Sequence, residues 1–306
     1  MTLAQYAQFS NYAVASATIV VALAFLAHVA EWGFARAVVK EPVAVGAGVS
    51  DVEADELPPR SDVFGRIGVS LATLAAIILL AGVVSRALAA ERVPWGNMYE
   101  FGVAGALISL VVYLGCVFTS GVQWLGGMVT GFALALLGLS MTTYVPAGPL
   151  VPALHSYWLV VHVAAVMIAG GLFLVGAAAS VLYLLKARAE SRGTVGPVLK
   201  RLPALGSMDR LAYRVHAVGF PIWTFGALIA GPIWAQHAWG RYWGWDPKEV
   251  WAFITWVVYA GYLHARATGG WRGKRAAYIA IIGFVTFLFS FYGINLFGSG
   301  LHSYAK

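Results

Sequence analysis

The chain has 306 residues, of which 60% are hydrophobic and only 11% are charged, and its mean hydropathy is +0.77. These values exclude a water-soluble globular protein and indicate an integral membrane protein. The net charge of +7 does not indicate a nucleic-acid partner, because the basic residues are dispersed at the ends of apolar runs.

Eight apolar runs are long enough to cross a bilayer, which needs roughly 20 helical residues per crossing. They lie near residues 11–34, 67–86, 100–119, 124–141, 157–185, 215–235, 248–266 and 276–294. We therefore predict an all-α integral membrane protein with about eight transmembrane helices, forming a single domain over residues 1–306. The first run follows no basic segment, so we expect it to remain as a helix rather than to be cleaved as a signal.

The distribution of basic residues predicts the orientation, since basic loops stay on the cytoplasmic side. Fifteen of the 20 Lys and Arg residues follow the first, third, fifth and seventh runs. The other five are Arg86, Arg92, Arg241, Lys248 and Lys306. This split predicts that both termini are extracytoplasmic, as is the loop between the sixth and seventh runs.

Two predicted cytoplasmic loops differ in charge. Residues 35–66 include an acidic stretch with Gly and Pro, which is typical of a flexible loop. Residues 186–214 are basic, and Pro197 to Leu211 are compatible with a surface helix on anionic lipid. The single Cys116 excludes a disulfide framework, a CxxC redox pair and a CxxCH haem attachment site within this chain.

The segment 236–249 is the most informative part of the chain. It crowds four aromatic residues and two glycines into seven positions: Trp239, Gly240, Tyr242, Trp243, Gly244 and Trp245, with Arg241 between them. An interfacial aromatic belt explains some of these rings, and a planar, largely apolar ligand explains their crowding beside glycines. Asp246, Pro247 and Glu249 match the start of a capped helix, with Glu249 reaching back to the cap.

Histidine is a common axial ligand of haem iron, and haem is planar and largely apolar. Of the seven histidines, His162 lies about five residues inside the fifth run, roughly 8 Å from its outer end, and His302 lies in the outer tail. Both could flank the segment 236–249. His264 lies 15 residues beyond the start of the capped helix, roughly 22 Å deeper, and therefore belongs to a different site.

The remaining histidines have simpler explanations. His28 lies three residues before Glu31, at the spacing of a helix-surface pair. His216 and His237 lie at the edges of predicted spans. A neutral ring bonded to a neighbouring helix is the ordinary alternative for any histidine in a span, although an ionisable residue there is also a functional candidate.

Several separated motifs resemble the CcsA (ResC) family, the haem-handling proteins of system II cytochrome c biogenesis. The longest is the tryptophan-rich (WWD) signature Trp239-Gly240-x-Tyr242-Trp243-x-Trp245-Asp246-Pro247-Lys248-Glu249, followed by Trp256 and Tyr262-Leu263-His264-x-Arg266. The others are Pro94-x-x-Asn97-x-Tyr99-Glu100, Ser156-Tyr157-Trp158-Leu159-x-x-His162-Val163, Asp209-x-Leu211-x-Tyr213-Arg214, Gly219-Phe220-Pro221 and Asn295-x-x-Gly298-x-Gly300-Leu301-His302-Ser303-Tyr304. The long acidic loop departs from the family pattern, as do His155, His216 and His237.

The resemblance implies a function and a set of ligands. Haem b, the substrate, would be bound through its iron by His162 and His302 on a platform of Trp239, Tyr242, Trp243, Trp245 and Asp246. His264 would ligate haem at an entry site whose second histidine comes from the partner CcsB (ResB), with His28 as the alternative within this chain. Arg241 and Lys248 are candidates to pair with the haem propionates.

The implied reaction is covalent attachment of haem to the CxxCH segment of an apocytochrome c on the extracytoplasmic face. The chain would then be half of a holocytochrome c synthase, with a thiol-reducing, thioredoxin-like protein as a further implied partner. The implied location is a bacterial plasma membrane, or a thylakoid membrane in a plastid. Two alternatives stay open: a haem exporter without ligase activity, and a b-type membrane cytochrome.

Overall fold

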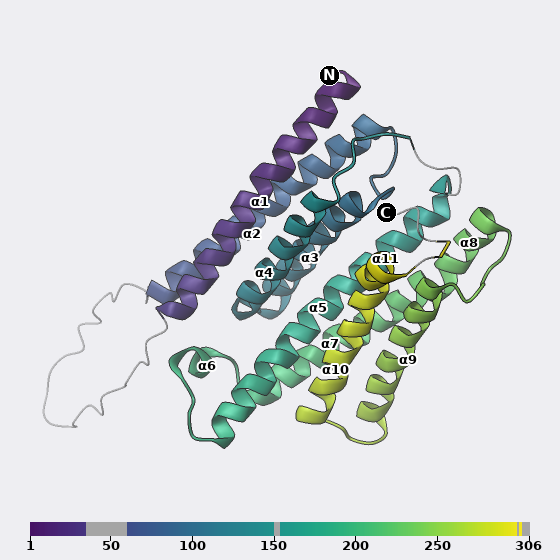
Figure 1. Cartoon of the computed structure of the whole chain (residues 1–306). Helices are drawn as coiled ribbons and strands as arrows, with labels where there is room; N and C mark the ends of the chain where they lie inside the picture. The colour runs from purple at the N-terminus through teal and green to yellow at the C-terminus, as the bar shows by residue number, and fades with distance from the viewer. Residues whose placement is uncertain (35–59, 150–153, 299, 302–306) are drawn as a thin grey trace, which may run out of the picture.

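The structure, a computed structural model, describes residues 1–34, 60–149, 154–298 and 300–301 (Figure 1). These residues form helices joined by turns, as the all-α prediction requires. The long helices are α1 (Leu3–Gly33), α2 (Arg60–Ala90), α3 (Met98–Ser120), α4 (Gly126–Thr142), α5 (Tyr157–Ser191), α7 (Leu205–Trp223), α8 (Gly231–Trp239), α9 (Pro247–Ala267) and α10 (Lys274–Leu288). The short ones are η1 (Gln123–Leu125), α6 (Pro197–Arg201), η3 (Thr224–Ala230), η4 (Phe289–Gly293) and α11 (Ile294–Phe297).

Seven helical segments of the described chain are long and apolar enough to cross a membrane, against the eight predicted. One of them, Leu205–Trp239, joins α7, η3 and α8. The predicted run 248–266 is α9, which is a helix of 21 residues but is not among the seven. Its Trp, Tyr and Thr residues, together with His264 and Arg266, make it less apolar than its neighbours. The prediction was right about the helix and wrong about its hydropathy.

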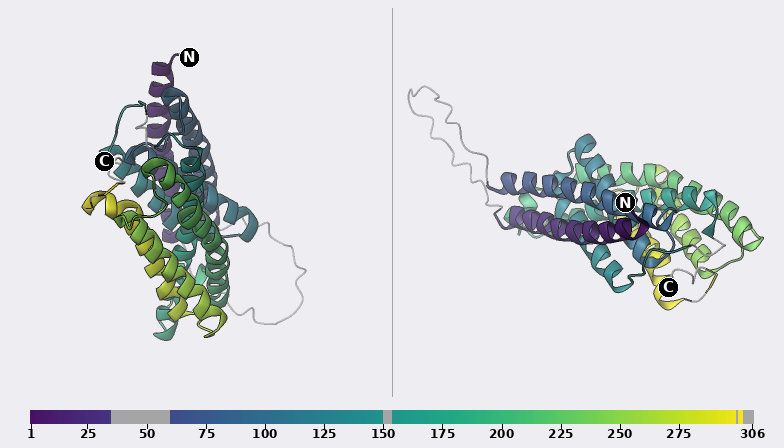
Figure 2. Two further views of the ribbon diagram at one scale, coloured as in Figure 1. Left: turned by 90° about the vertical axis from the view of Figure 1, so that its right-hand side faces the viewer. Right: turned by 90° about the horizontal axis from the view of Figure 1, so that it is seen from above.

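The helices extend beyond the apolar runs that predicted them. The segment 186–214 is largely helical, because α5 continues to Ser191 and α7 already begins at Leu205, with α6 between them. Most of the predicted loop 35–66 lies outside the described residues, although α2 begins at Arg60. The N-terminus and the α8–α9 loop lie at one end of the bundle, here called the Trp-loop end (Figures 1 and 2). The α9–α10 turn and α6 lie at the opposite end.

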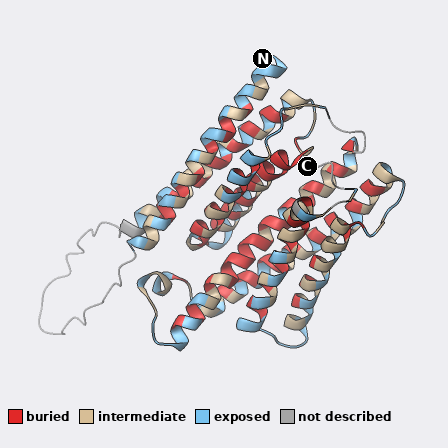
Figure 3. Ribbon diagram, viewed as in Figure 1, coloured by how far each residue is buried: buried red, intermediate tan, exposed pale blue. Residues whose placement is uncertain are grey.

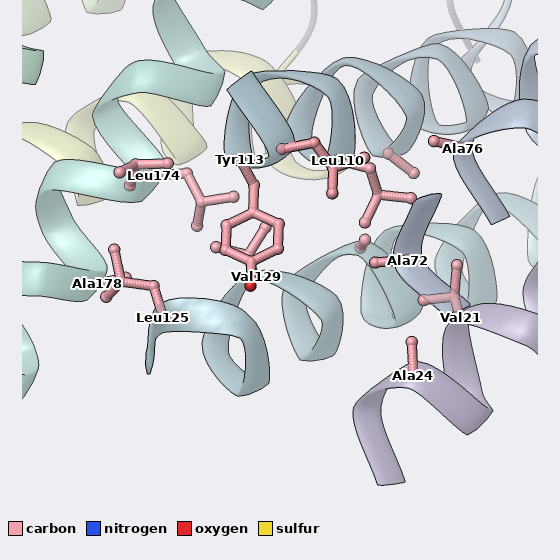
Figure 4. Packing of buried hydrophobic residues seen from close by; sticks show 14 of the residues in the cluster. Val21, Ala24, Ala72, Ala76, Leu110, Tyr113, Leu125, Val129, Leu174 and Ala178 are labelled. Carbon is pink, nitrogen blue, oxygen red and sulfur yellow. The ribbon is translucent and has the colours of Figure 1, made fainter. Parts of the chain in front are cut away.

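Small side chains allow the helices to approach closely along the middle of the bundle. Ala17 and Ala24 of α1 and Ala72 and Ala75 of α2 are fully buried in one apolar cluster. Tyr113 of α3 is also fully buried in this cluster (Figure 4). Buried residues line the inward faces of the helices, whereas the outward faces are mixed (Figure 3). Such close packing of small residues is typical of helices in membranes, where packing contacts drive helix association.

A buried ion cluster joins three segments at the Trp-loop end. The carboxylate of Glu100, whose side chain is fully buried, accepts hydrogen bonds from Arg86 Nε (2.9 Å), Arg92 Nη1 (2.7 Å) and Gly96 N (2.7 Å). Arg86 also donates to the carbonyl of Val145, and Arg92 to that of Gly148. The motif around Asn97 and Glu100 therefore ties the start of α3 to the end of α2 and to the loop after α4.

Two π-helical segments interrupt the helices of the C-terminal half. In η3 the N–H of Gly231 bonds to the carbonyl of Gly226, five residues earlier. The second segment, η4, lies between α10 and α11. Each π turn holds one residue more than an α turn, and such turns are frequent at functional sites.

Candidate functional site

A pocket opens at the Trp-loop end between α3, α5, η3, α8, α9 and η4. The space between its lining atoms is about 920 Å³, part of which is open to solvent. Its walls are mainly apolar and aromatic, and its polar side chains include one histidine and one lysine. The aromatic and ionisable residues are Phe101, His162, Trp223, Trp234, Trp239, Tyr242, Trp243, Lys248, Glu249, Phe287 and Phe291.

His162 of α5 enters this pocket in a defined tautomer. Its Nδ1 lies 2.8 Å from the carbonyl oxygen of Gly226, and because a carbonyl only accepts, Nδ1 must carry the proton. In the neutral ring Nε2 is then the nitrogen with a lone pair. Metal-bound histidines commonly have this arrangement, with the other ring nitrogen donating to a backbone carbonyl.

The π turn of η3 allows this contact. A Cβ on Gly226 would lie 2.9 Å from Cβ of Ala165 and 3.0 Å from Cγ1 of Val166, so only glycine permits the close approach to α5. A Cβ on Gly231 would lie 3.1 Å from His162 Nδ1. The two glycines therefore let the backbone of η3 reach the imidazole.

Aromatic rings continue from His162 into the segment 236–249 that joins α8 and α9, here called the Trp loop. The ring of Trp234 lies nearly parallel to that of His162, at 9° and 5.9 Å between centroids. Trp239 meets Trp234 at 66° and 4.8 Å. Trp239, Tyr242 and Trp243 also line the pocket, so three of the four loop aromatics share one site with His162.

Trp245 and Asp246 lie in the same loop but do not line the pocket. Trp245 is 66% exposed, adopts a positive φ of 56°, which is rare for a bulky residue, and contacts Trp243 and Phe253 edge-on. Asp246 is buried and forms the expected capping box with Glu249 at the start of α9. Its Oδ2 also accepts a 2.8 Å hydrogen bond from Leu301 N.

The other predicted ligands lie elsewhere. His264 is exposed near the opposite end of α9, away from the pocket, as its spacing predicted. His302 lies outside the described residues. The last described residue before it is Leu301, which is bonded to Asp246.

His28 and His216 are both fully buried. His28 Nδ1 lies 3.0 Å from Glu31, the predicted pair, and its ring packs against Gly68 of α2 and Gly126 of α4. Since α1 and α9 lie at opposite edges of the bundle (Figures 1 and 2), His28 and His264 are not brought together. His216 lies inside the span Leu205–Trp239 rather than at its edge, and its ring packs against Phe173, Tyr259 and Tyr262.

Sequence reasoning missed part of the pocket wall. Trp234 lies five residues before the tryptophan-rich signature, within the apolar run 215–235, where the sequence pattern does not distinguish it from other residues of the run. Met98 and Phe101 line the pocket because they follow the capping residue Asn97 on one face of α3. Their three-residue spacing beside the Asn97–Glu100 motif was a signal that could have identified them.

The fold and the pocket define a class: a multi-pass membrane protein that presents a histidine in an aromatic pocket. The model of the Cytochrome C assembly protein family matches residues 70–302. The cytochrome c biogenesis protein CcsA of Synechococcus elongatus is 36% identical over 287 residues, covering 78% of this chain and 86% of that protein. CcsA of Chlamydomonas reinhardtii is 35% identical over 277 residues, covering 84% and 77%.

The solved structure of Cytochrome c Heme Lyase CcmF is also similar, with a TM-score of 0.59 over 97% of this chain. At 17% identity this likeness shows the fold alone, and the chain spans about half the length of that lyase. The CcsA matches decide the family. This chain belongs to the CcsA family of cytochrome c biogenesis proteins.

Proposed function

We propose that the chain holds haem in the pocket at the Trp-loop end and presents it for covalent attachment to CxxCH segments of apocytochromes c. The observation that carries this proposal is the His162–Gly226 hydrogen bond inside an aromatic pocket. It orients one imidazole Nε2 as an iron ligand, and the flat rings of Trp239 and Trp243 suit a porphyrin. His302 is the proposed second ligand.

The protein's part in the reaction is positioning. Each thiol adds across a haem vinyl group, so that a C–S bond forms at one vinyl carbon and the thiol proton ends on the other. No net oxidation occurs, and the haem and the thiols carry the covalent chemistry. Holding the haem edge beside two thiols turns an encounter in solution into a reaction within one complex.

The exposed position of His264 supports a second haem site shared with another subunit. An ionisable side chain exposed on a membrane protein is a candidate for pairing with a group of another subunit. We propose that a histidine of a CcsB (ResB) partner supplies the other ligand there, and that haem enters at this site before it reaches the pocket. This assigns the chain to one half of a synthase in a plasma or thylakoid membrane, with the Trp loop extracytoplasmic.

The test is covalent haem on a CxxCH reporter, measured when the chain and its partner are expressed together. His162→Gly should abolish attachment, and imidazole in the medium should partly restore it by filling the vacant coordination position. His237→Ala is the matched control, because His237 is exposed at the same end of the bundle. Haem that reaches the pocket but is never attached would instead support an exporter.

A further inference from the structure

Lys248 is a cation of the pocket wall that forms no direct ion pair among the described residues. It lies in the first turn of α9, and its ammonium donates to Oδ1 of Asn295 at 3.2 Å. A lysine ammonium has three donors, and an amide oxygen supplies no countercharge.

The two nearest carboxylates in the sequence have other tasks. Glu249 Oε2 accepts from the backbone N–H groups of Gly244 (2.8 Å) and Asp246 (3.0 Å). Asp246 accepts from Lys248 N through Oδ1 and from Leu301 N through Oδ2. Both side chains are therefore engaged in capping α9 and in holding the loop and the tail.

The position of Asn295 keeps the ammonium inside the pocket. Its amide Nδ2 donates to the carbonyl of Phe291 (2.7 Å) and to Met98 Sδ (3.1 Å), which directs Oδ1 toward Lys248. Asn295 is buried, and Met98 and Phe291 also line the pocket. The lysine is thus held between α9 and α11 by a side chain that is itself fixed.

A lysine ammonium in an apolar pocket is costly without a direct ion pair, and an acidic group on the ligand would reduce that cost. We infer that Lys248 binds a carboxylate of the pocket's ligand and thereby fixes which edge of that ligand faces α9. The inference rests on the proposed function, in which the ligand is haem and the carboxylates are its propionates. The propionate edge would then lie beside Lys248, between α9 and α11, and the edge with the vinyl groups would face away from Lys248.

Arg241 is the other candidate to pair with a haem propionate, and its replacement provides a control. It is exposed in the same loop, and its guanidinium packs over Gly244 rather than lining the pocket. Replacing Arg241 changes the net charge of the loop by the same amount as replacing Lys248. A general effect of charge on haem binding would therefore appear in both variants.

The test compares haem with haem dimethyl ester, titrated into the purified full-length chain with its partner in detergent and followed by absorption. The wild-type protein should bind haem about 10- to 100-fold more tightly than the ester, as expected for one charge-assisted hydrogen bond. Lys248→Gln should bind both with the affinity that the wild type has for the ester. Lys248→Arg and Arg241→Gln should keep the preference for the acid.

Equal binding of acid and ester by the wild-type protein would overturn the assignment of Lys248, whether or not the variants fold. A preference retained in Lys248→Gln, or lost in Arg241→Gln, would do the same. If neither porphyrin bound the wild-type protein, the proposed function would fail, and this assignment with it. The two failures are therefore distinguishable.

Discussion

The backbone N–H of Leu301 donates a 2.8 Å hydrogen bond to Oδ2 of Asp246, the residue that caps α9. A Cβ on Gly300 would collide with the same carboxylate, so the chain passes very close to the Trp loop at this point. One aspartate therefore fixes both the start of α9 and the residue just before His302. Asp246 does not line the pocket, and outside α9 it contacts Leu301.

Asp246→Ala should lower haem attachment to the reporter as strongly as His302→Gly, because the segment before His302 loses its anchor. Loss of the helix cap should lower the free energy of unfolding by only about 1 kcal/mol. Thr2→Ala is the matched control, since it removes the capping box of α1 without touching the tail. Full attachment in the Asp246 variant would show that the tail does not need this anchor.

Gly226→Ala should weaken haem binding while the helices remain folded. The new Cβ would push η3 away from Ala165 and Val166 and move the carbonyl that orients His162. Haem titration of the purified protein measures this effect, with circular dichroism as the check on folding. Gly138→Ala in α4 is the control, because nothing lies within 4 Å of its added methyl group, and it should bind haem like the wild type.

His264→Ala should remove the haem held between His264 and the partner, but should leave the free energy of unfolding of the chain alone unchanged to within about 0.5 kcal/mol, since the ring is exposed. His28→Ala should behave in the opposite way. This substitution leaves a cavity between α1, α2 and α4 and should lower the free energy of unfolding by about 2 kcal/mol or more, without loss of the haem bound at His264. If the His28 variant lost the absorption spectrum of the haem bound at His264, the second ligand of that haem would be His28 and not a histidine of the partner.

Glu100→Gln should destabilise the chain by about 3 kcal/mol, because Arg86 and Arg92 would be left near a neutral amide in a buried site. Denaturant unfolding in detergent measures this. Glu91→Gln, an exposed change in the same connection, should have almost no effect. Equal stability of the two variants would mean that the buried cluster contributes nothing to the fold.

Hydropathy located the helices well but not their ends. The predicted first run is 11–34, whereas α1 begins at Leu3, because polar residues such as Gln5 and Gln8 belong to a helical turn that hydropathy does not detect. For α9 the reverse held: the capping motif located its start correctly, although its aromatic and polar residues reduce its hydropathy. Local signals thus define where a helix starts more sharply than composition defines where it ends.

The pocket was only partly predictable. The Trp loop and His162 belong to recognisable motifs. Because His162 lies near the outer end of its span, the two could be expected to lie at the same depth. Trp245 is exposed and does not line the pocket, and no spacing rule predicts its positive φ. The contact between Gly226 and His162 joins residues 64 positions apart and depends on how η3 packs against α5.

The extra residue of the π turn in η3 also sets how α8 is rotated about its axis. An α-helix advances roughly 100° per residue, so closing η3 into regular α geometry would rotate all of α8 by about that angle relative to α5. Trp234 would then leave the face of His162, and Trp239 would turn with it. Deleting a single residue from Thr224–Ala230 would therefore disassemble the aromatic wall without replacing any residue that lines it.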